Sequence, residues 1–461
     1  MSAREAVRAL AARLAEADRA GLNATLAWSL DALTGQADRL DASGSAGPLQ
    51  QIPVAVKDNI VTTDLPTTCG SRLLEGYRSP FDATVVERLR SAGALVACKS
   101  NLDEFAMGSS TEHSAYGRVR HPLDHARVPG GSSGGSAALV AAGVVPAALG
   151  SETGGSVRQP ASFCGVVGIK PSYGRVSRYG LVAFGSSLDC VSVFGRTVDA
   201  AAAVLRVISG HDPRDATSLR LPPVARAPAR ESLDGVVVGV PREYFPDDLD
   251  PGVRAGCRLA LERLRRLGAT TRDVSLPHTR LAVPAYYVIA PAEAAANLAR
   301  FDGVRYGRRA GKVADVRALY RATRGEGFGD EVRRRILVGT YVLSAGYYDA
   351  YYRRAQAVRR RIAADFDEVF GSGIDLLFTP TTPTTAFLAG EKTADPVAMY
   401  LADIFVSPAS LAGLPAMSLP IGRSEGLPVG GQLIAPRNGE EGMLAAARVI
   451  ESAGDGAAEV R

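Results

Sequence analysis

Short apolar runs alternate with amphipathic segments along most of this chain. Runs rich in valine, leucine and alanine predict β-strands at 52–60, 94–100, 236–245, 375–383 and 416–422. Segments with apolar residues at helical spacing predict α-helices at 82–94, 254–269 and 349–370. Because strands and helices alternate, the pattern predicts an α/β fold with a mostly parallel or mixed sheet.

Three further segments bear on location and domain organisation. Residues 1–21 alternate charged and apolar residues at helical spacing, which predicts an amphipathic helix and not a signal peptide. The most apolar stretch, 136–150, is short, rich in small residues and interrupted by Pro146, so we expect a buried helix that runs into a strand and no membrane span. Residues 220–235 form the one linker-like stretch, and without an internal repeat we expect a single domain over 1–461.

Composition removes several classes of function. The 461 residues are 46% hydrophobic and 22% charged, as in an ordinary globular protein with a large core. A net charge of +5 and no basic tract longer than three residues give no reason to expect nucleic-acid binding by this chain alone. The five cysteines are odd in number and form no C-x-x-C pair, which excludes a zinc ribbon and indicates reduced thiols in a cytoplasm.

Glycine and serine cluster twice, in "VPGGSSGGSA" at 128–137 and "GSETGGSVRQP" at 150–160. Such composition alone is typical of a flexible linker. Both runs, however, adjoin hydrophobic segments that need burial, and pinned glycine-rich runs often bring backbone N–H groups together around a ligand. Neither run has the lysine of a phosphate-binding loop, so nucleotide binding is disfavoured.

A serine hydrolase of the nucleophile-elbow type fits poorly. Residues 130–134 match G-x-S-x-G, but the preceding "HPLDHARVP" is not a strand. The only later histidines, His211 and His278, lie in polar loop sequences and are better interpreted as solvated residues than as bases.

Lysine is the next candidate for a base, and it is rare in this chain. Only five of the 53 basic residues are lysines, and Lys57 lies in the apolar run "IPVAVKDNI". A buried ammonium can lose its proton, whereas a guanidinium cannot. The competing interpretation is a structural lysine whose amine reaches solvent at a strand end.

Lys57, the Ser132–Ser133 pair and Ser156 together resemble the Ser-cisSer-Lys triad of the amidase signature family. The motifs "GGSSGGSAA" and "GSETGGSVRQPASFCGVVGIKPSYGRVSRYG" carry the resemblance, which extends over nearly the whole chain. It implies a large mixed β-sheet covered by helices on both faces, with an N-terminal helical segment at about 1–45 and a catalytic core at about 50–200.

The resemblance also implies roles for these residues. Ser156 is expected to be the nucleophile and Lys57 the base, with Ser132, after a cis peptide bond, relaying the proton. Backbone N–H groups of Thr153, Gly154, Gly155 and Ser156 are expected to form an oxyanion hole, which the two glycines permit by allowing the turn. Arg158 and Gln159 are expected to brace this loop.

Other blocks of sequence resemble one group within the family, the glutamine-hydrolysing subunits of tRNA-dependent amidotransferases. These blocks include "AEAAANLARFDGVRYG", "RGEGFGDEVRRRI" and "GTYVLSAGYYDAYY". For glutamine, the resemblance implies that Arg335 binds the α-carboxylate, Asp403 binds the α-ammonium group and Tyr287, or its neighbour Tyr286, lines the pocket.

The same resemblance implies two partner proteins, which with this chain would form a heterotrimer. The larger partner is expected to handle ATP, Mg²⁺ and misacylated Glu-tRNA(Gln) or Asp-tRNA(Asn), and a small third protein is expected to hold the pair together. This chain itself is expected to need no metal or cofactor. A stand-alone amidase acting on another small amide, and a scaffold protein with an idle triad, remain the alternatives.

Four positions depart from the family pattern. Cys190 and Val193 lie in "SSLDCVSVF", and Val406 and Ser410 lie in "VSPAS", next to the expected glutamine site. The departures leave the triad intact and bear on substrate preference and on the exit route for ammonia.

Overall fold

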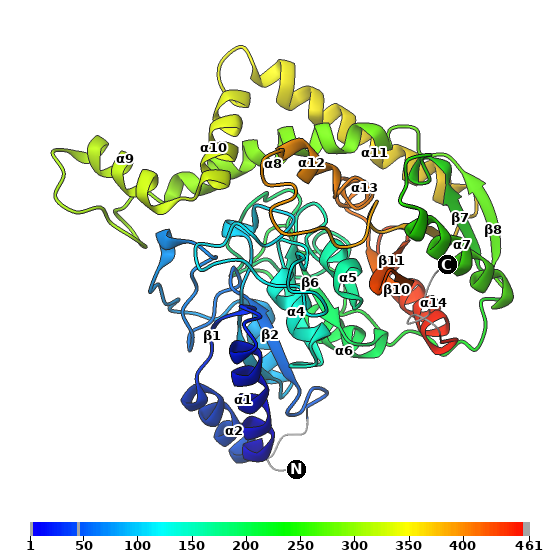
Figure 1. Ribbon diagram of the computed structural model, residues 1–461, viewed down its shortest axis with the longest axis horizontal. Helices are drawn as coiled ribbons and strands as arrows, with labels where there is room; N and C mark the ends of the chain where they lie inside the picture. The colour runs from blue at the N-terminus through cyan, green and yellow to red at the C-terminus, as the bar shows by residue number, and fades with distance from the viewer. Residues whose placement is uncertain (1–2, 44–46, 455–461) are drawn as a thin grey trace.

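A computed structural model describes residues 3–43 and 47–454 of the chain (Figure 1). Within these residues, eleven strands form one mixed sheet in the order β1-β3-β2-β4-β6-β5-β10-β11-β9-β7-β8. The strands are β1 (Thr25–Ala27), β2 (Pro53–Lys57), β3 (Leu95–Ser100), β4 (Ala147–Glu152), β5 (Val167–Lys170), β6 (Cys190–Gly195), β7 (Val237–Pro241), β8 (Thr270–Val274), β9 (Leu376–Pro380), β10 (Ala416–Ser424) and β11 (Leu427–Ile434). The strand β2 is parallel to β3 and β4, and β7 is parallel to β8 and β9, whereas the other pairs are antiparallel.

Helices cover both faces of this sheet. They are α1 (Ala3–Arg19), α2 (Leu30–Ser43), α3 (Thr84–Ser91), α4 (Gly134–Ala141), α5 (Arg158–Cys164), α6 (Val198–Ile208), α7 (Pro251–Arg266), α8 (Ala282–Asn297), α9 (Val316–Gly327), α10 (Asp330–Val342), α11 (Arg354–Gly371), α12 (Pro396–Leu401), α13 (Ser407–Ala412) and α14 (Glu440–Ser452). Short 3-10 turns and one π-helical turn at Tyr348–Arg353 complete the described elements.

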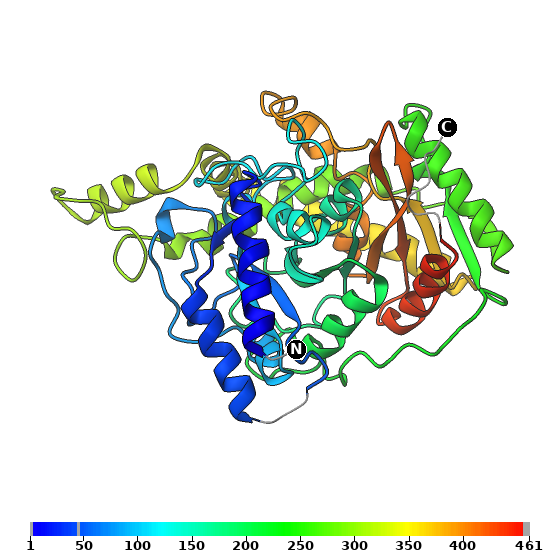
Figure 2. The ribbon, with the colours of Figure 1, turned by 60° about the horizontal axis from the view of Figure 1, so that its bottom comes forward.

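The alternation of side chains along β2 explains why both faces are covered. Val54 and Val56 belong to a core cluster that includes residues of α3 and α6. Ala55, on the opposite face of the strand, belongs to a second cluster with residues of α1 and α4. In Figure 2 the two N-terminal helices, drawn in blue, lie side by side on the second face. The predicted α/β fold with helices on both faces is therefore confirmed.

All eight predicted strands and helices are present. The amphipathic N-terminal helix is α1, with Val7, Leu10 and Leu14 buried, although residues 1, 2 and 44–46 lie outside the described part. The apolar stretch 136–150 supplies most of α4 and the first strand residues of β4, as predicted.

The linker-like segment 220–235 contains no helix or strand. It does not divide the sheet, because β5, which precedes this segment, pairs with β10, which follows it. No helix within 3–43 and 47–454 combines the length and the hydropathy that crossing a membrane requires.

Candidate active site

Lys57 ends strand β2 in the interior of the molecule, with no exposed surface. Its Nζ atom lies 2.7 Å from Ser132 Oγ, 2.8 Å from Ser133 Oγ and 3.2 Å from the carbonyl oxygen of Ser151. Strand β2 therefore places the Lys57 amine within hydrogen-bonding distance of the serine pair in the first Gly/Ser segment.

Burial lowers the pKa of Lys57 to about 7, because an ammonium group without water around it is unstable. The charges of Asp103, Asp189 and Glu152 oppose this shift, but the described residues include no carboxylate in an ion pair with Lys57. The adjacent Asp58 pairs with Lys99 at 2.9 Å instead. An amine with this pKa exists partly in its neutral, basic form near neutral pH, as the sequence predicted.

Ser132 follows a cis peptide bond from Gly131, in agreement with the family pattern. The backbone on both sides is held tightly: the Gly131 N–H donates to Gln159 Oε1 at 3.0 Å, and the Asp103 N–H donates to the Ser132 carbonyl oxygen at 3.2 Å. A Cβ atom on Gly131 would lie 2.2 Å from Asp103 Oδ2, so only glycine fits there.

Ser156 lies in the turn between β4 and α5 and is nearly buried, with 7% of its surface exposed. Its carbonyl oxygen accepts a hydrogen bond from the Ser133 N–H at 3.2 Å, which joins the two Gly/Ser segments. Within the described part of the chain, the Ser156 hydroxyl forms no hydrogen bond, and neither do the backbone N–H groups of residues 153–156. These donors are free to bind an oxyanion beside the hydroxyl.

Gly154 and Gly155 have a different purpose from the one that the sequence suggested. Neither has the positive φ that only glycine adopts easily, so the turn itself does not require them. A Cβ on Gly154 would lie 2.9 Å from the Tyr286 ring, and one on Gly155 would lie 2.1 Å from Val406 Cγ2. The glycines are needed because side chains from other elements approach this loop closely.

Arg158 braces the loop, as predicted. The side chain is fully buried and forms an ion pair with Glu152, in which Nε and Nη2 both donate to Oε1. It also donates to the carbonyl oxygens of Gly154 at 3.1 Å and Val406 at 2.7 Å. Gln159 connects the loop to its surroundings, since its amide nitrogen donates to the Ser109 carbonyl oxygen at 2.7 Å.

The expected glutamine-binding residues come from three distant elements and meet at one side of this loop. Arg335 on α10 is 4% exposed, whereas Arg333 and Arg334 of the same triplet are exposed. The Arg335 guanidinium lies 5.4 Å from the centre of the Tyr287 ring, and its Nε atom pairs with Glu331 at 2.7 Å. Tyr286 contacts the loop instead, so both tyrosines lie beside the site.

Asp403 lies next to the loop, 3.0 Å from the position that a Gly155 Cβ would occupy. Its Oδ2 atom accepts a hydrogen bond from Ser109 Oγ at 2.5 Å, whereas its buried Oδ1 atom has no partner among the described residues. Burial raises the pKa of Asp403 to about 7. A buried oxygen without a partner is suited to a cationic ligand group.

Several contacts of this site could not be inferred from the sequence. Ser133 and the Ser151 carbonyl share the Lys57 amine, Ser109 holds Asp403, and Asp189 accepts a hydrogen bond from Thr153 Oγ1 at 2.6 Å. Burial raises the pKa of Asp189 to about 6. These contacts depend on tertiary structure, and the sequence marked Ser133 only as a member of the serine pair and Asp189 only as part of "SSLDCVSVF".

The four departures from the family pattern lie close to this site. Val406 packs on Gly155, and Ser410 Oγ donates to the Gly154 carbonyl oxygen at 2.7 Å and also contacts Glu152. Cys190 and Val193 are buried on β6, which pairs with β4 just before the loop. All four therefore shape the surroundings of the loop and leave the triad in place.

Other kinds of site find no support in the described residues. They contain no cluster of three or more histidine, cysteine or acidic side chains suited to a metal ion. His278 is partly exposed and pairs with Asp365 at 2.8 Å, and His211 is exposed. Among the described residues, no hydrogen bond joins either histidine to Ser132, Ser133 or Ser156. All five cysteines are free and buried.

Comparison with known proteins agrees with the geometry. A family model described as Amidase matches residues 5–444. The chain is 56% identical to the A subunit of glutamyl-tRNA(Gln) amidotransferase from Symbiobacterium thermophilum over 440 residues, which cover 94% of this chain and 90% of that protein.

Solved structures give the same result. The crystal structure of the A subunit of glutamyl-tRNA(Gln) amidotransferase from Thermotoga maritima is 49% identical, with a TM-score of 0.76 over 90% of this chain and 88% of that one. The structure of 6-aminohexanoate cyclic dimer hydrolase is 27% identical, with a TM-score of 0.82 over 98% and 94% of the two chains. By the family model, by sequence identity and by fold, this chain belongs to the amidase signature family.

Proposed function

We propose that this chain hydrolyses the side-chain amide of glutamine and supplies the ammonia that converts misacylated Glu-tRNA(Gln), or Asp-tRNA(Asn), to the correctly charged tRNA. The observation that carries the chemistry is the contact of 2.7 Å between Lys57 Nζ and Ser132 Oγ, beside the loop that bears Ser156. The relatives named for glutamyl-tRNA(Gln) amidotransferase support this choice of substrate within the family.

In the first half of the reaction, Ser156 Oγ attacks the amide carbon of glutamine. Its proton passes to Ser132 Oγ while the Ser132 proton passes to the neutral amine of Lys57. The negative oxygen that forms is held by backbone N–H groups of residues 153–156. The C–N bond then breaks, the proton returns through Ser132 to the leaving nitrogen, and ammonia departs from a glutamyl ester of Ser156.

In the second half, water attacks the ester carbon and gives up a proton by the same route to Lys57. The ester bond breaks, the proton returns to Ser156 Oγ, and glutamate leaves. Arg335, a buried cation, binds the α-carboxylate of glutamine, and the free carboxylate oxygen of Asp403 binds its α-ammonium group.

The partners belong to the same proposal. ATP and Mg²⁺ act in a second protein, which also binds most of the tRNA, and a small third protein completes the heterotrimer in the cytoplasm. The names of the relatives support membership of a multi-subunit enzyme, because each is named as one lettered subunit of an amidotransferase.

The test is to assay glutamine hydrolysis by this chain, alone and purified with its partner subunits, against the variant Ser156→Ala. We expect the variant to lose activity while its melting temperature is retained, because one small side chain replaces another in the loop. A folded Ser156→Ala protein with near-normal glutaminase activity would remove Ser156 from the nucleophile role. Turnover of other small amides without turnover of glutamine would favour a stand-alone amidase.

A further inference from the structure

Helix α10 carries Arg335, and its first turn is capped by a residue from a distant part of the chain. Gly329 precedes the helix and offers no side chain that could bind the free N–H groups of the first turn. Instead, the Gly329 N–H donates to Oε2 of Glu104 at 2.8 Å. A Cβ on Gly329 would lie 2.5 Å from the same oxygen, so the glycine permits this close approach.

Glu104 is held in place on its other side. Its Oε1 atom accepts a short hydrogen bond from Ser71 Oγ, which also lies 3.3 Å from the Gly327 carbonyl oxygen. The Glu104 residue is 2% exposed, and burial raises its pKa to about 7, while the hydrogen bonds from Ser71 and Gly329 favour the ionised form. A negative charge at this position stabilises the N-terminus of a helix.

The segment that contains Glu104 also contacts both other parts of the site. The preceding residue, Asp103, donates its N–H to the carbonyl oxygen of Ser132. Five residues after Glu104, Ser109 donates to Asp403. The backbone between them is sharply bent, since Phe105 and Ala106 have φ values of 50° and 62°. The segment 103–109 therefore forms hydrogen bonds with Ser132, with Asp403 and with Gly329 at the start of the helix that carries Arg335.

We propose that Glu104 is a positioning residue for substrate, which fixes α10, and with it Arg335, relative to Ser132 and Asp403. This inference rests on the proposed function, because it assigns Arg335 to the α-carboxylate of glutamine. Glu104 contacts no reacting group; it sets the distance between the two charged groups that bind the ends of the amino acid. Its loss therefore affects binding of glutamine more than the chemistry at Ser156.

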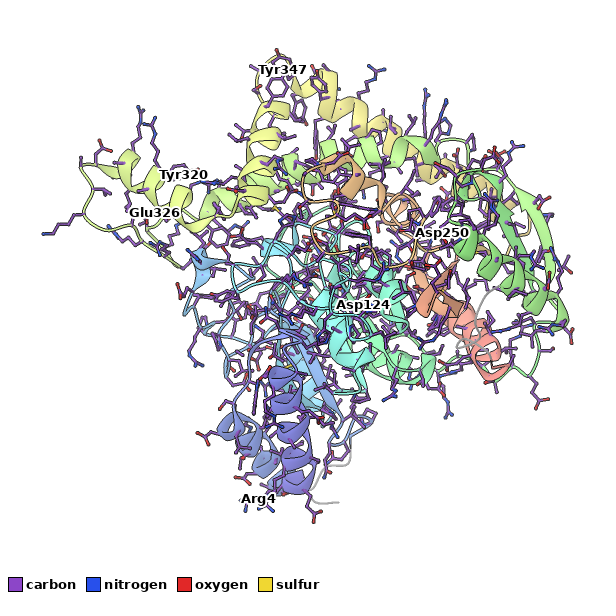
Figure 3. All side chains as sticks on the ribbon, viewed as in Figure 1. Arg4, Asp124, Asp250, Tyr320, Glu326 and Tyr347 are labelled. Atoms are coloured by element: carbon purple, nitrogen blue, oxygen red, sulfur yellow. The ribbon has the colours of Figure 1, made fainter. Side chains whose placement is uncertain are left out.

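The main test compares Glu104→Ala with Glu104→Gln in the chain purified with its partner subunits. We expect Glu104→Ala to raise KM for glutamine about tenfold with kcat changed less than about twofold, because the binding geometry loosens while the triad is intact. Glu104→Gln keeps an oxygen for the Gly329 N–H and should restore most of the affinity. Glu326→Ala is the matched control, since Glu326 is an exposed glutamate on the protruding α9 (Figure 3).

Two further measurements separate positioning from a general structural role. Hydrogen exchange of residues 329–335 should accelerate in Glu104→Ala but not in Glu326→Ala. In an Arg335→Met background, Glu104→Ala should raise KM no further, because the group through which it acts is absent.

The opposite results would overturn the inference. These are an unchanged KM in Glu104→Ala, a loss confined to kcat, or an independent additional loss in the Arg335→Met background. If Glu104→Ala does not fold, Ser71→Ala, which removes the hydrogen bond that holds Glu104 Oε1, is measured in the same way. An unchanged KM and unchanged hydrogen exchange in that variant would overturn the inference. If the wild-type enzyme does not hydrolyse glutamine, the proposed function fails; unchanged exchange at 329–335 would then separately reject the capping role of Glu104.

Discussion

At the scale of single residues, the site depends on an amine that can lose its charge. Lys57 lies among apolar strand residues, bonded to two hydroxyl groups and a carbonyl oxygen, without an ion pair among the described residues. The sequence made this residue visible because lysine is rare in the chain and Lys57 lies in an apolar run. It could not reveal Ser109, because the contact of Ser109 with Asp403 forms only when distant segments pack together.

The first prediction follows from this difference between lysine and arginine. Lys57→Arg keeps the positive charge and much of the volume, but the guanidinium stays protonated. We expect it to lose about 10²–10⁴-fold in kcat for glutamine, as does Lys57→Ala, because both lack the base. The measurement is kcat for glutamine in both variants, with melting curves to confirm that they fold. Lys312→Arg, at an exposed lysine, is the control. An active Lys57→Arg enzyme would mean that Lys57 has only a structural role.

The second prediction concerns pH. Since burial lowers the pKa of Lys57 to about 7, its neutral form dominates above that pH and is lost below it. We therefore expect kcat for glutamine to fall about tenfold per unit as the pH drops below about 7, and to level off above it. Asp403 titrates near the same pH, so Asp403→Asn is the control, and it should keep the pH dependence of kcat. A kcat that stays constant from mildly acidic to mildly alkaline pH would contradict the assignment.

At the scale of elements, the loop between β4 and α5 is shaped by its neighbours. Its glycines are close-packed against Tyr286 on α8 and against Val406, which immediately precedes α13. The Gly/Ser-rich sequence predicted a place where backbone donors gather, and the N–H groups of residues 153–156 have no partner among the described residues. The reason for each glycine could not be obtained from the sequence, because the approaching side chains lie far away along the chain.

The third prediction uses this packing. Gly155→Ala places a Cβ 2.1 Å from Val406 Cγ2, so the loop must shift and its N–H groups lose their alignment. We expect a loss of about 10²–10³-fold in kcat, similar to the loss of an oxyanion donor. Adding Val406→Ala removes the clashing methyl group and should restore part of the activity.

The control for this pair is Gly442→Ala on α14, where a Cβ meets nothing within 4 Å and activity should be unchanged. If Val406→Ala gives no recovery, the close approach of Val406 is not what requires glycine at position 155.

Some strands could be predicted from the sequence and others could not. Runs of valine and leucine marked the buried strands β2, β3, β7, β9 and β10. By contrast, β8 has the polar sequence TTRDV at the edge of the sheet, and β11 contains two adjacent glycines. Neither pattern is typical of a strand, and both are strands because a neighbouring strand offers hydrogen bonds.

At the scale of the whole molecule, two parts of the chain build one site. The triad and the loop lie between residues 57 and 156, whereas Tyr287, Arg335 and Asp403 come from helices and a turn between 282 and 406. The continuous sheet joins these parts, and in Figure 1 the helices α8, α10 and α12 lie together on one side of the central strands. Under the proposed function, this arrangement separates the chemistry of the amide from recognition of the amino acid.

The last prediction exploits this separation in the complete assembly. Asp403→Asn keeps a side-chain oxygen for Ser109 but removes the negative charge expected to bind the α-ammonium group of glutamine. We expect KM for glutamine to rise about 10–100-fold, because a charge-assisted hydrogen bond is lost. Amidation of misacylated tRNA with free ammonia as the nitrogen donor should stay near normal, since ammonia bypasses this site. Asp367→Asn, at an exposed position on α11, is the control, and neither donor should be affected. Equal losses with glutamine and with ammonia would show that Asp403 supports the structure or the partner reaction, and that the amino acid is recognised elsewhere.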